Sequence, residues 1–232
     1  MDMPRRLPAP ARDSADCRRC PLELRCWPEA DPADGPVPVV REPAMRSGQF
    51  LWRPGDPFTG PVIVHSGCVM IFRTTPAGTE RVLQFALAGD LIGLEALSRG
   101  RHDQYAQAQG EVLCCRVRWS PAAAAAETPG LYGRLLRRAS QMLAAAQQRA
   151  RPEDPIASVL NFLRDISRRL GHEEADGGRR RHQVRLPMSR LDIGRYLGFA
   201  EETVCRAIRR LQDQGLIEAR GRQISLLEAA WR

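Results

Sequence analysis

The chain has 232 residues, of which 43% are hydrophobic and 27% are charged, and its formal net charge is +8. This length allows one large or two modest domains with buried cores. The sequence has no run of about eighteen apolar residues and no apolar signal-peptide segment at its start, so we expect a cytoplasmic protein without a membrane partner. All 35 basic residues are arginine, and the absence of lysine is most simply a coding bias. Arginine nonetheless binds phosphate and guanine in a bidentate manner, so the composition is also compatible with a nucleic-acid partner.

Three of the seven cysteines, Cys17, Cys20 and Cys26, lie close together near the amino terminus. Crowded thiolates repel one another unless a disulfide or a metal takes up their charge, and disulfides are rare in a reducing compartment. A fourth ligand must come from elsewhere, and Cys114-Cys115 is the best source. Adjacent residues of a strand point to opposite faces, so only one of these two thiols can face the cysteine-bearing arm. The spacing alone leaves both zinc and an iron-sulfur cluster open.

Between Arg41 and Trp119, short apolar runs alternate with turn signals such as Arg53-Pro-Gly-Asp56 and Thr75-Pro-Ala-Gly78. This pattern predicts a small antiparallel barrel or jelly roll. Cys68 lies inside one run, where we expect it to be buried as a small hydrophobic residue. The predicted strands are Pro61–His65, Gly67–Arg73, Glu80–Ala86, Gln104–Gln109 and Val112–Val117.

A long helix is predicted from Thr128-Pro-Gly130 to about Ala150, where Pro152 ends it. Apolar residues recur on one face of this helix at alternating spacings of four and three. They are Tyr132, Leu136, Ala139, Leu143, Ala146 and Ala150. Such a helix either packs on the barrel or pairs with a second copy of itself. The small alanines at its end permit close approach and favour a homodimer.

A second helix is predicted from Asp154 or Pro155 to Leu170. Residues 171–182 are polar and contain three consecutive arginines, so we expect a loop whose arginines are solvated or contact phosphate. The apolar face of the helix comprises Ile156, Val159, Leu160, Leu163 and Ile166.

The segment from Met188 to Leu211 predicts two short helices joined by a tight turn at Gly198-Phe199-Ala200. Ser189 is the expected cap of the first helix. Two helices joined in this way are typical of a helix-turn-helix motif, and the basic turn Arg220-Gly-Arg222 predicts a wing hairpin after it. The residues expected inside are Leu191, Ile193 or Gly194, Leu197, Val204, Ile208 and Leu211.

The outer face of the second helix can read DNA, because arginine pairs with guanine and glutamate accepts from cytosine in the major groove. The alternative is an exposed amphipathic helix with ion pairs such as Glu202 with Arg206. The preceding helix, the turn and the wing favour DNA reading. We assign the DNA contact to Ser189, Arg190, Glu202, Thr203, Cys205, Arg206 and Arg209.

The order of barrel, long helix and winged helix-turn-helix resembles the Crp/Fnr family of bacterial transcription regulators over nearly the whole chain. The most specific matches are Leu87-Ala-Gly-Asp-Leu-Ile-Gly93, Leu191-Asp-Ile-Gly-Arg-Tyr-Leu-Gly198 and Glu202-Thr-Val-Cys-Arg206. The resemblance implies an α+β fold with a jelly-roll β-barrel like that of cyclic-nucleotide-binding domains. It implies a flexible cysteine-bearing arm at 1–30, a sensor barrel at 31–126, a dimerisation helix at 127–152 and a DNA-binding domain at 153–232.

Within the family the chain is similar to the oxygen-responsive Fnr branch, where C-x2-C-x5-C and one barrel cysteine ligate a [4Fe-4S] cluster. Cys17, Cys20 and Cys26 match that spacing, and the resemblance implies Cys115 as the fourth ligand. It further implies a homodimer that binds double-stranded DNA at a palindromic site with half-sites close to TTGAT. RNA polymerase is an expected partner if the protein is an activator.

Two departures from the family pattern affect the expected ligand and the DNA contact. Nucleotide-binding members hold the cyclic phosphate with an arginine, whereas Gln104-Tyr105 stands at the corresponding position here, so we do not expect cyclic AMP to bind. Cys205 occupies the serine position of the Fnr motif E-x-x-S-R, as in FixK-like regulators, and its oxidation could act as a switch.

Two other functions stay open from the sequence. One is a regulator with structural zinc or no metal that responds to another signal, because four thiolates also satisfy tetrahedral zinc. The other is an enzyme with a cysteine thiolate, but no histidine is clearly placed to serve it, so we predict that the protein is not an enzyme. The histidines are His65, His102, His172 and His182.

Overall fold

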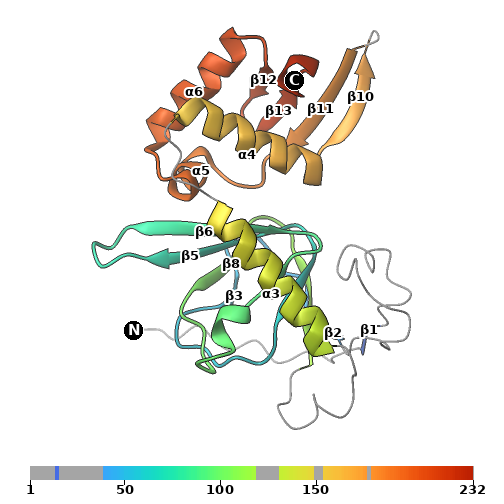
Figure 1. Cartoon of the computed structure of the whole chain (residues 1–232), viewed down its shortest axis with the longest axis vertical. Helices are drawn as coiled ribbons and strands as arrows, with labels where there is room; N and C mark the ends of the chain where they lie inside the picture. The colour runs from blue at the N-terminus through green and yellow to red at the C-terminus, as the bar shows by residue number, and fades with distance from the viewer. Residues whose placement is uncertain (1–13, 16–38, 119–130, 149–153, 177–178, 232) are drawn as a thin grey trace. The chain divides into compact units, whose positions relative to one another are not determined.

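The computed structural model describes residues 14–15, 39–118, 131–148, 154–176 and 179–231. The chain forms two compact units, one comprising Met1–Val69 and Ala86–Leu143 and the other Met70–Phe85 and Ala144–Arg232. Figure 1 shows the β-strands of the amino-terminal half and the helices and short sheet of the carboxy-terminal half. Within the described residues, the element order confirms the predicted α+β class.

Two antiparallel sheets make up the barrel, which confirms the jelly-roll prediction. The first sheet has the order β1-β2-β9-β4-β7, and the second has the order β3-β8-β5-β6. The first sheet comprises β1 (Ser14–Ala15), β2 (Val39–Arg41), β4 (Val62–Ser66), β7 (Leu91–Ile92) and β9 (Leu113–Val117). The second comprises β3 (Phe50–Trp52), β5 (Cys68–Thr74), β6 (Glu80–Leu87) and β8 (Tyr105–Ala108).

The barrel core is formed by the apolar runs that the sequence predicts as strands. Val62 and Val64 on β4 and Val69 on β5 are completely buried, and so is Cys68, which confirms its expected place in the core. The turn between these strands requires Gly67, because a β-carbon there would lie 2.2 Å from the backbone oxygen of Glu111. Apolar burial of this kind is the main source of folding free energy.

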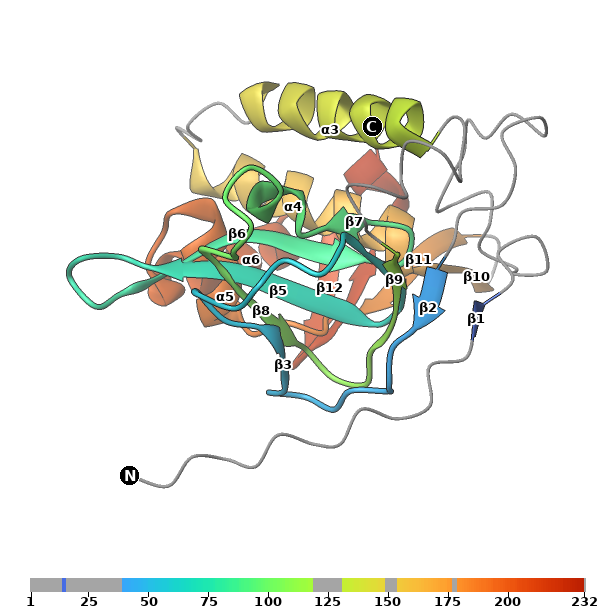
Figure 2. The same ribbon diagram turned by 90° about the horizontal axis from the view of Figure 1, so that it is seen from below.

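The strands β5 and β6 form a long hairpin, which Figure 2 shows from below. The turn between them is closed by a 2.7 Å hydrogen bond from the amide of Thr75 to the backbone oxygen of Thr79. The hydroxyl groups of the same two threonines also lie 2.7 Å apart. Gly78 adopts a φ of +77° in this turn, which favours glycine.

The helix α3 (Leu131–Gln148) corresponds to the predicted long helix, and its last predicted residue, Ala150, lies outside the described residues. The next helix, α4 (Pro155–Leu170), begins at the predicted position. Asp154 caps it by accepting hydrogen bonds from the amides of Ile156 and Ala157. Proline in the first turn is tolerated because its missing N–H would have no helical partner there.

The two short helices of the predicted motif are α5 (Arg190–Leu197) and α6 (Glu201–Asp213). The turn between them is compact because the amides of Gly198 and Phe199 both donate to the backbone oxygen of Gly194, at 2.8 and 2.9 Å. Gly198 ends α5 with a φ of +82°, as glycine commonly does at helix ends. Helix α4 packs against α6, and α6 packs against α5 (Figure 1).

The sheet of the second unit differs from the prediction at its edge. Its order is β10-β11-β13-β12, comprising β10 (His172–Asp176), β11 (Arg179–Arg185), β12 (Ile217–Arg220) and β13 (Gln223–Leu226). The wing strands β12 and β13 confirm the predicted hairpin, but the loop prediction for residues 171–182 was wrong. The polar β10 is an edge strand, and β11 pairs with β13 through backbone groups, which need no apolar side chains.

Candidate DNA interface and cysteine site

Helix α6 has one buried face and one exposed face. Val204, Ala207, Ile208 and Leu211 are at most 2% exposed, which confirms the predicted inner face and adds Ala207 to it. Glu202, Arg206 and Arg209 are exposed on the other side, while Thr203 and Cys205 are half-buried. A helix with this division can place long polar side chains in a major groove while its apolar face holds it on the protein.

The ion pair between Glu202 and Arg206 is present but weak. Their charged atoms lie 3.9 Å apart, and their side chains are 79% and 66% exposed. Exposed pairs of this kind contribute little free energy because water screens them. Both side chains are therefore able to leave the pair and contact bases.

Ser189 and Arg190 lie at the start of α5, beside the exposed face of α6. Ser189 forms a capping box, because its hydroxyl oxygen accepts from the amide of Asp192 at 3.1 Å and its own amide donates to the Asp192 carboxylate at 3.0 Å. Arg190 Nη1 donates to Cys205 Sγ at 3.5 Å, so the contact joins two of the assigned residues on different helices.

The wing tip also lies beside the start of α5, which the sequence pattern did not reveal. The amide of Leu186 donates to the backbone oxygen of Arg222 at 2.9 Å, and Arg222 Nη1 donates to the backbone oxygen of Pro187 at 3.1 Å. These contacts hold the basic wing turn against the segment that leads into α5. Arg220 is exposed on the same turn, so the positive charge of the site extends beyond the two helices.

The inward assignments for α5 are correct in part. Ile193 and Gly194 are buried as predicted, and Leu197 is half-buried. Leu191 is 40% exposed, so its predicted inward position was wrong. Leu191 lies two residues before the buried Ile193 on α5, and residues two apart on a helix point to different sides of it.

The three amino-terminal cysteines, Cys17, Cys20 and Cys26, lie outside the described residues. The described residues just before them form β1, which pairs with β2 in the register Ser14 with Val40. The strand β2 in turn pairs with β9, with Arg41 opposite Cys115. The chain that leads into the arm is therefore separated from the strand of Cys115 by only one strand. Since neighbouring strands lie about 4.8 Å apart, this separation is about 10 Å.

Cys114 and Cys115 differ in their burial and their chemistry. Cys114 is completely buried, whereas Cys115 keeps 8% of its surface exposed. Burial raises the pKa of the Cys114 thiol to about 12, and the neighbouring Cys115 adds to this shift. Without a metal, Cys114 is therefore a neutral thiol of the barrel core at neutral pH. Within the described residues, no three histidine, cysteine or acidic side chains cluster as a metal site.

Helix α3 exposes part of the predicted dimer face. Leu136 and Leu143 are 73% and 61% exposed, and Ala139 is half-buried. The opposite side is held on the barrel, where Leu135 is buried and Arg138 Nη2 donates to the backbone oxygen of Gly89 at 2.8 Å. The other predicted residues of this face are not described by the structure. They are the side chains of Tyr132 and Ala146 and the whole of Ala150.

Comparison with known proteins agrees with this architecture. A Crp-like helix-turn-helix domain matches residues 156–230, and a cyclic nucleotide-binding domain matches residues 44–127. The transcriptional activator protein anr of Pseudomonas aeruginosa is 32% identical over 94% of this chain and 91% of its own length. The chain belongs to the Crp/Fnr family. It is a DNA-binding transcription regulator and not an enzyme, as the sequence predicts.

Two further similarities place this Crp/Fnr regulator among known sequences and structures. The fumarate and nitrate reduction regulatory protein of Escherichia coli K12 is 28% identical over 90% of this chain and 86% of its own length. The structure of FixK2 from Bradyrhizobium japonicum has a TM-score of 0.65 and 29% identity, and covers 84% of this chain and 94% of FixK2.

The barrel of this Crp/Fnr regulator carries a buried histidine. His102 is 3% exposed, stacks on Trp52 with ring centroids 4.2 Å apart, and shares a 2.9 Å hydrogen bond with Glu95. Neither Gln104 nor Tyr105 supplies the positive charge that would hold a cyclic phosphate, and the absence of cyclic AMP binding stays a prediction from the sequence.

No helix among the residues that the structure describes is both long and apolar enough to cross a membrane.

Proposed function

We propose that this regulator responds to oxygen through a [4Fe-4S] cluster held by Cys17, Cys20, Cys26 and Cys115, and that it binds a palindromic DNA site as a homodimer. The observation that carries the proposal is the strand order β1-β2-β9, because only the strand β2 lies between the chain before Cys17 and the strand of Cys115. The relatives named above support it, since one is a transcriptional activator and another regulates fumarate and nitrate reduction.

The residues present fit such a cluster. The C-x2-C-x5-C arm supplies three thiols, and Cys115, which is buried with 8% of its surface exposed, supplies a fourth. When bound, an iron-sulfur cluster supplies redox chemistry at cysteine-ligated iron. The strand β1, just before the arm, pairs with β2 of the barrel sheet. Cys114, next to Cys115 in the sequence, stays neutral in the barrel core.

The DNA contact is proposed at α6 and the start of α5. Arg206 and Arg209 are exposed and can take guanine in a bidentate manner, and Glu202 can accept from cytosine. Arg190 and the wing turn are placed to contact backbone phosphates, which position the protein without reading sequence. We expect half-sites close to TTGAT, with the second position the most variable.

The homodimer is proposed through α3. Leu136 and Leu143 expose large apolar side chains on one face of a helix whose other face is held on the barrel. Burying two such side chains from each copy would provide a favourable apolar contact. Two copies related by a two-fold axis would present two recognition helices to the two half-sites of a palindrome. If the protein activates transcription, RNA polymerase is its further partner.

The test is an anaerobic absorption spectrum of the purified full chain, with iron and sulfide counts. We expect a broad visible band with iron and sulfide in the wild type, loss of both in Cys20→Ser and Cys115→Ser, and retention in the control Cys68→Ala. A colourless protein with stoichiometric zinc would support the structural-zinc alternative and overturn the cluster. DNA binding that is the same before and after exposure to air would overturn oxygen sensing alone.

A further inference from the structure

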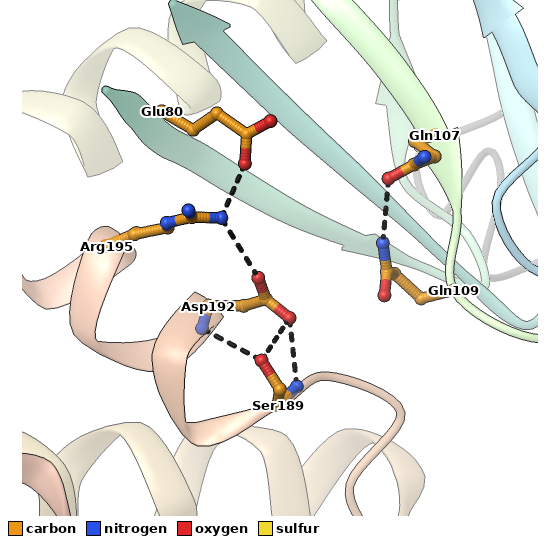
Figure 3. A network of polar contacts seen from close by, with 6 residues as sticks. All are labelled: Glu80, Gln107, Gln109, Ser189, Asp192 and Arg195. Atoms are coloured by element: carbon orange, nitrogen blue, oxygen red, sulfur yellow. Dashed lines mark hydrogen bonds and ion pairs between the residues drawn. The ribbon is translucent and has the colours of Figure 1, made fainter. Parts of the chain in front are cut away.

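The β5–β6 hairpin contacts the first helix of the helix-turn-helix through a polar network within the second unit (Figure 3). Arg195 Nη1 on α5 donates to Glu80 Oε2 on β6 at 2.5 Å. The same nitrogen lies 3.9 Å from Asp192 Oδ1. The other carboxylate oxygen of Asp192 accepts a 2.6 Å hydrogen bond from the hydroxyl of Ser189. One guanidinium thus joins the hairpin to the residues that cap α5.

An aromatic cluster accompanies this network. Phe85 on β6 lies against Tyr196 on α5 with ring centroids 5.3 Å apart, and against Phe162 on α4 at 5.9 Å. Phe162 and Tyr196 are themselves 5.7 Å apart, so the three rings contact one another in pairs. Phe85 and Phe162 are 5% and 7% exposed. Tilted rings at these separations attract one another beyond the effect of burial alone.

Ser189 is the one residue of these contacts that is also assigned to DNA, whereas Glu80, Arg195 and the three aromatic residues are not. Arg195 and Tyr196 lie near the end of α5, whereas Arg190 lies at its start and Arg206 on α6. The hairpin contact and a DNA contact can therefore exist in the same molecule. Asp192 connects the two, because it binds Arg195 on one oxygen and the cap residue Ser189 on the other.

We propose that Glu80 and Arg195 are positioning residues for DNA binding, through which the β5–β6 hairpin holds α5 and its capped start in the orientation that meets the DNA backbone. This inference rests on the proposed DNA interface. Both strands of the hairpin also belong to the four-stranded sheet β3-β8-β5-β6.

The charges favour positioning over direct phosphate contact. Glu80 and Asp192 are both near Arg195, so its positive charge is neutralised and its affinity for a phosphate is low. The side chains of Arg195 and Glu80 are 32% and 37% exposed, so the pair is partly shielded from water but not part of the core. Its loss should leave the fold intact while α5 becomes more mobile.

The test measures the affinity of the full chain for a duplex carrying an inverted repeat of TTGAT, over a series of salt concentrations. The variants are Glu80→Gln, Arg195→Gln and the double variant. We expect each single variant to weaken binding about threefold, on the scale of a partly exposed ion pair. The double variant should bind no more weakly than Arg195→Gln alone, because the two residues act through one contact.

The salt dependence separates a positioning role from a phosphate contact. In Glu80→Gln the slope of log affinity against log salt should stay unchanged, whereas in Arg190→Gln it should fall by about one unit. Amide hydrogen exchange should become faster in α5 of Glu80→Gln. Asp103→Asn, which removes the exposed pair between Asp103 and Arg99, is the matched control and should show none of these effects.

The outcomes distinguish this inference from the proposed function. If the wild type does not bind the duplex, the proposed DNA site is wrong. If the wild type binds but Glu80→Gln has wild-type affinity and wild-type exchange in α5, the positioning role is wrong. The positioning role is also wrong if the losses of binding free energy in the two single variants add fully in the double variant. Thermal unfolding of each variant checks that the fold survives.

Discussion

A β-carbon on Gly194 would lie 2.6 Å from the backbone oxygen of Phe199, so the turn of the helix-turn-helix closes directly on the first helix. The amide of Phe199 donates back to the backbone oxygen of Gly194 at 2.9 Å. The close approach of α5 to the turn thus depends on the absence of a side chain at this position.

Gly194→Ala should therefore destabilise the protein, since the methyl group meets backbone atoms that cannot rotate away. We expect a loss of about 1–3 kcal/mol in the free energy of unfolding, measured by denaturant titration, together with weaker DNA binding. The control is Gly133→Ala on α3, where the nearest atom is an arginine side-chain nitrogen at 3.9 Å. That change should be neutral or slightly stabilising, because alanine favours helix more than glycine does. Equal stability of the two variants would contradict the steric argument.

Arg206→Gln should weaken binding to the preferred half-site by about 1–3 kcal/mol and relax selectivity at one base pair, because a bidentate guanine contact is lost. Arg220→Gln in the wing should instead weaken binding to all sequences alike and lower the salt slope. Competition assays with single-base variants of the duplex distinguish the two. Arg99→Gln, at a 73% exposed side chain of the barrel, should leave both affinity and selectivity unchanged.

Leu136→Glu and Leu143→Glu should each shift the protein from dimer to monomer, because a charge would be buried at the apolar contact between two copies of α3. Sedimentation velocity over a range of protein concentrations measures this change. Leu97→Glu is the matched control, since Leu97 is another large apolar residue, 44% exposed, that belongs to the barrel segment and not to α3. A dimer that persists in both α3 variants would place the interface elsewhere.

Cys114 should make stability fall at alkaline pH. A thiol of the unfolded chain loses its proton near the ordinary pKa of 9.0, whereas the pKa of Cys114 in the fold is about 12. Between these values the folded state binds more protons, so the free energy of unfolding decreases as pH rises, by at most about 1.4 kcal/mol per pH unit. Denaturant titrations at pH 8 and pH 10 should show a smaller decrease for Cys114→Val than for the wild type.

The same burial should protect Cys114 from alkylation. Iodoacetamide reacts with the thiolate, so at pH 8 the native protein should be labelled at Cys205, which is half-buried, and not at Cys114. Peptide mass mapping measures the sites. Rapid labelling of Cys114 in the folded protein would contradict this prediction, because it would show that the barrel core around Cys114 opens to solvent.

Local pattern in the sequence was sufficient for most of the elements. Asp154 and Ser189 cap their helices where the sequence indicates, because capping depends on residues only two or three positions away. The strands β1, β2, β3 and β7 were missed, since each has three residues or fewer and shows no alternation of its own. The edge strand β10 was taken for a loop, because its pairing with β11 uses backbone groups that leave no apolar signature.

The sequence by itself determined the family, most of the strands, the long helix, the two helices of the helix-turn-helix and the spacing of the amino-terminal cysteines, because these are properties of residues near one another in the chain. Only the tertiary structure decided which distant residues meet. Strand order separates Ser14 from Cys115 by a single strand, burial makes Cys114 a neutral core residue, and Arg195 meets Glu80 across 115 positions of sequence. Such contacts follow from how strands and helices pack together, and no local periodicity records them.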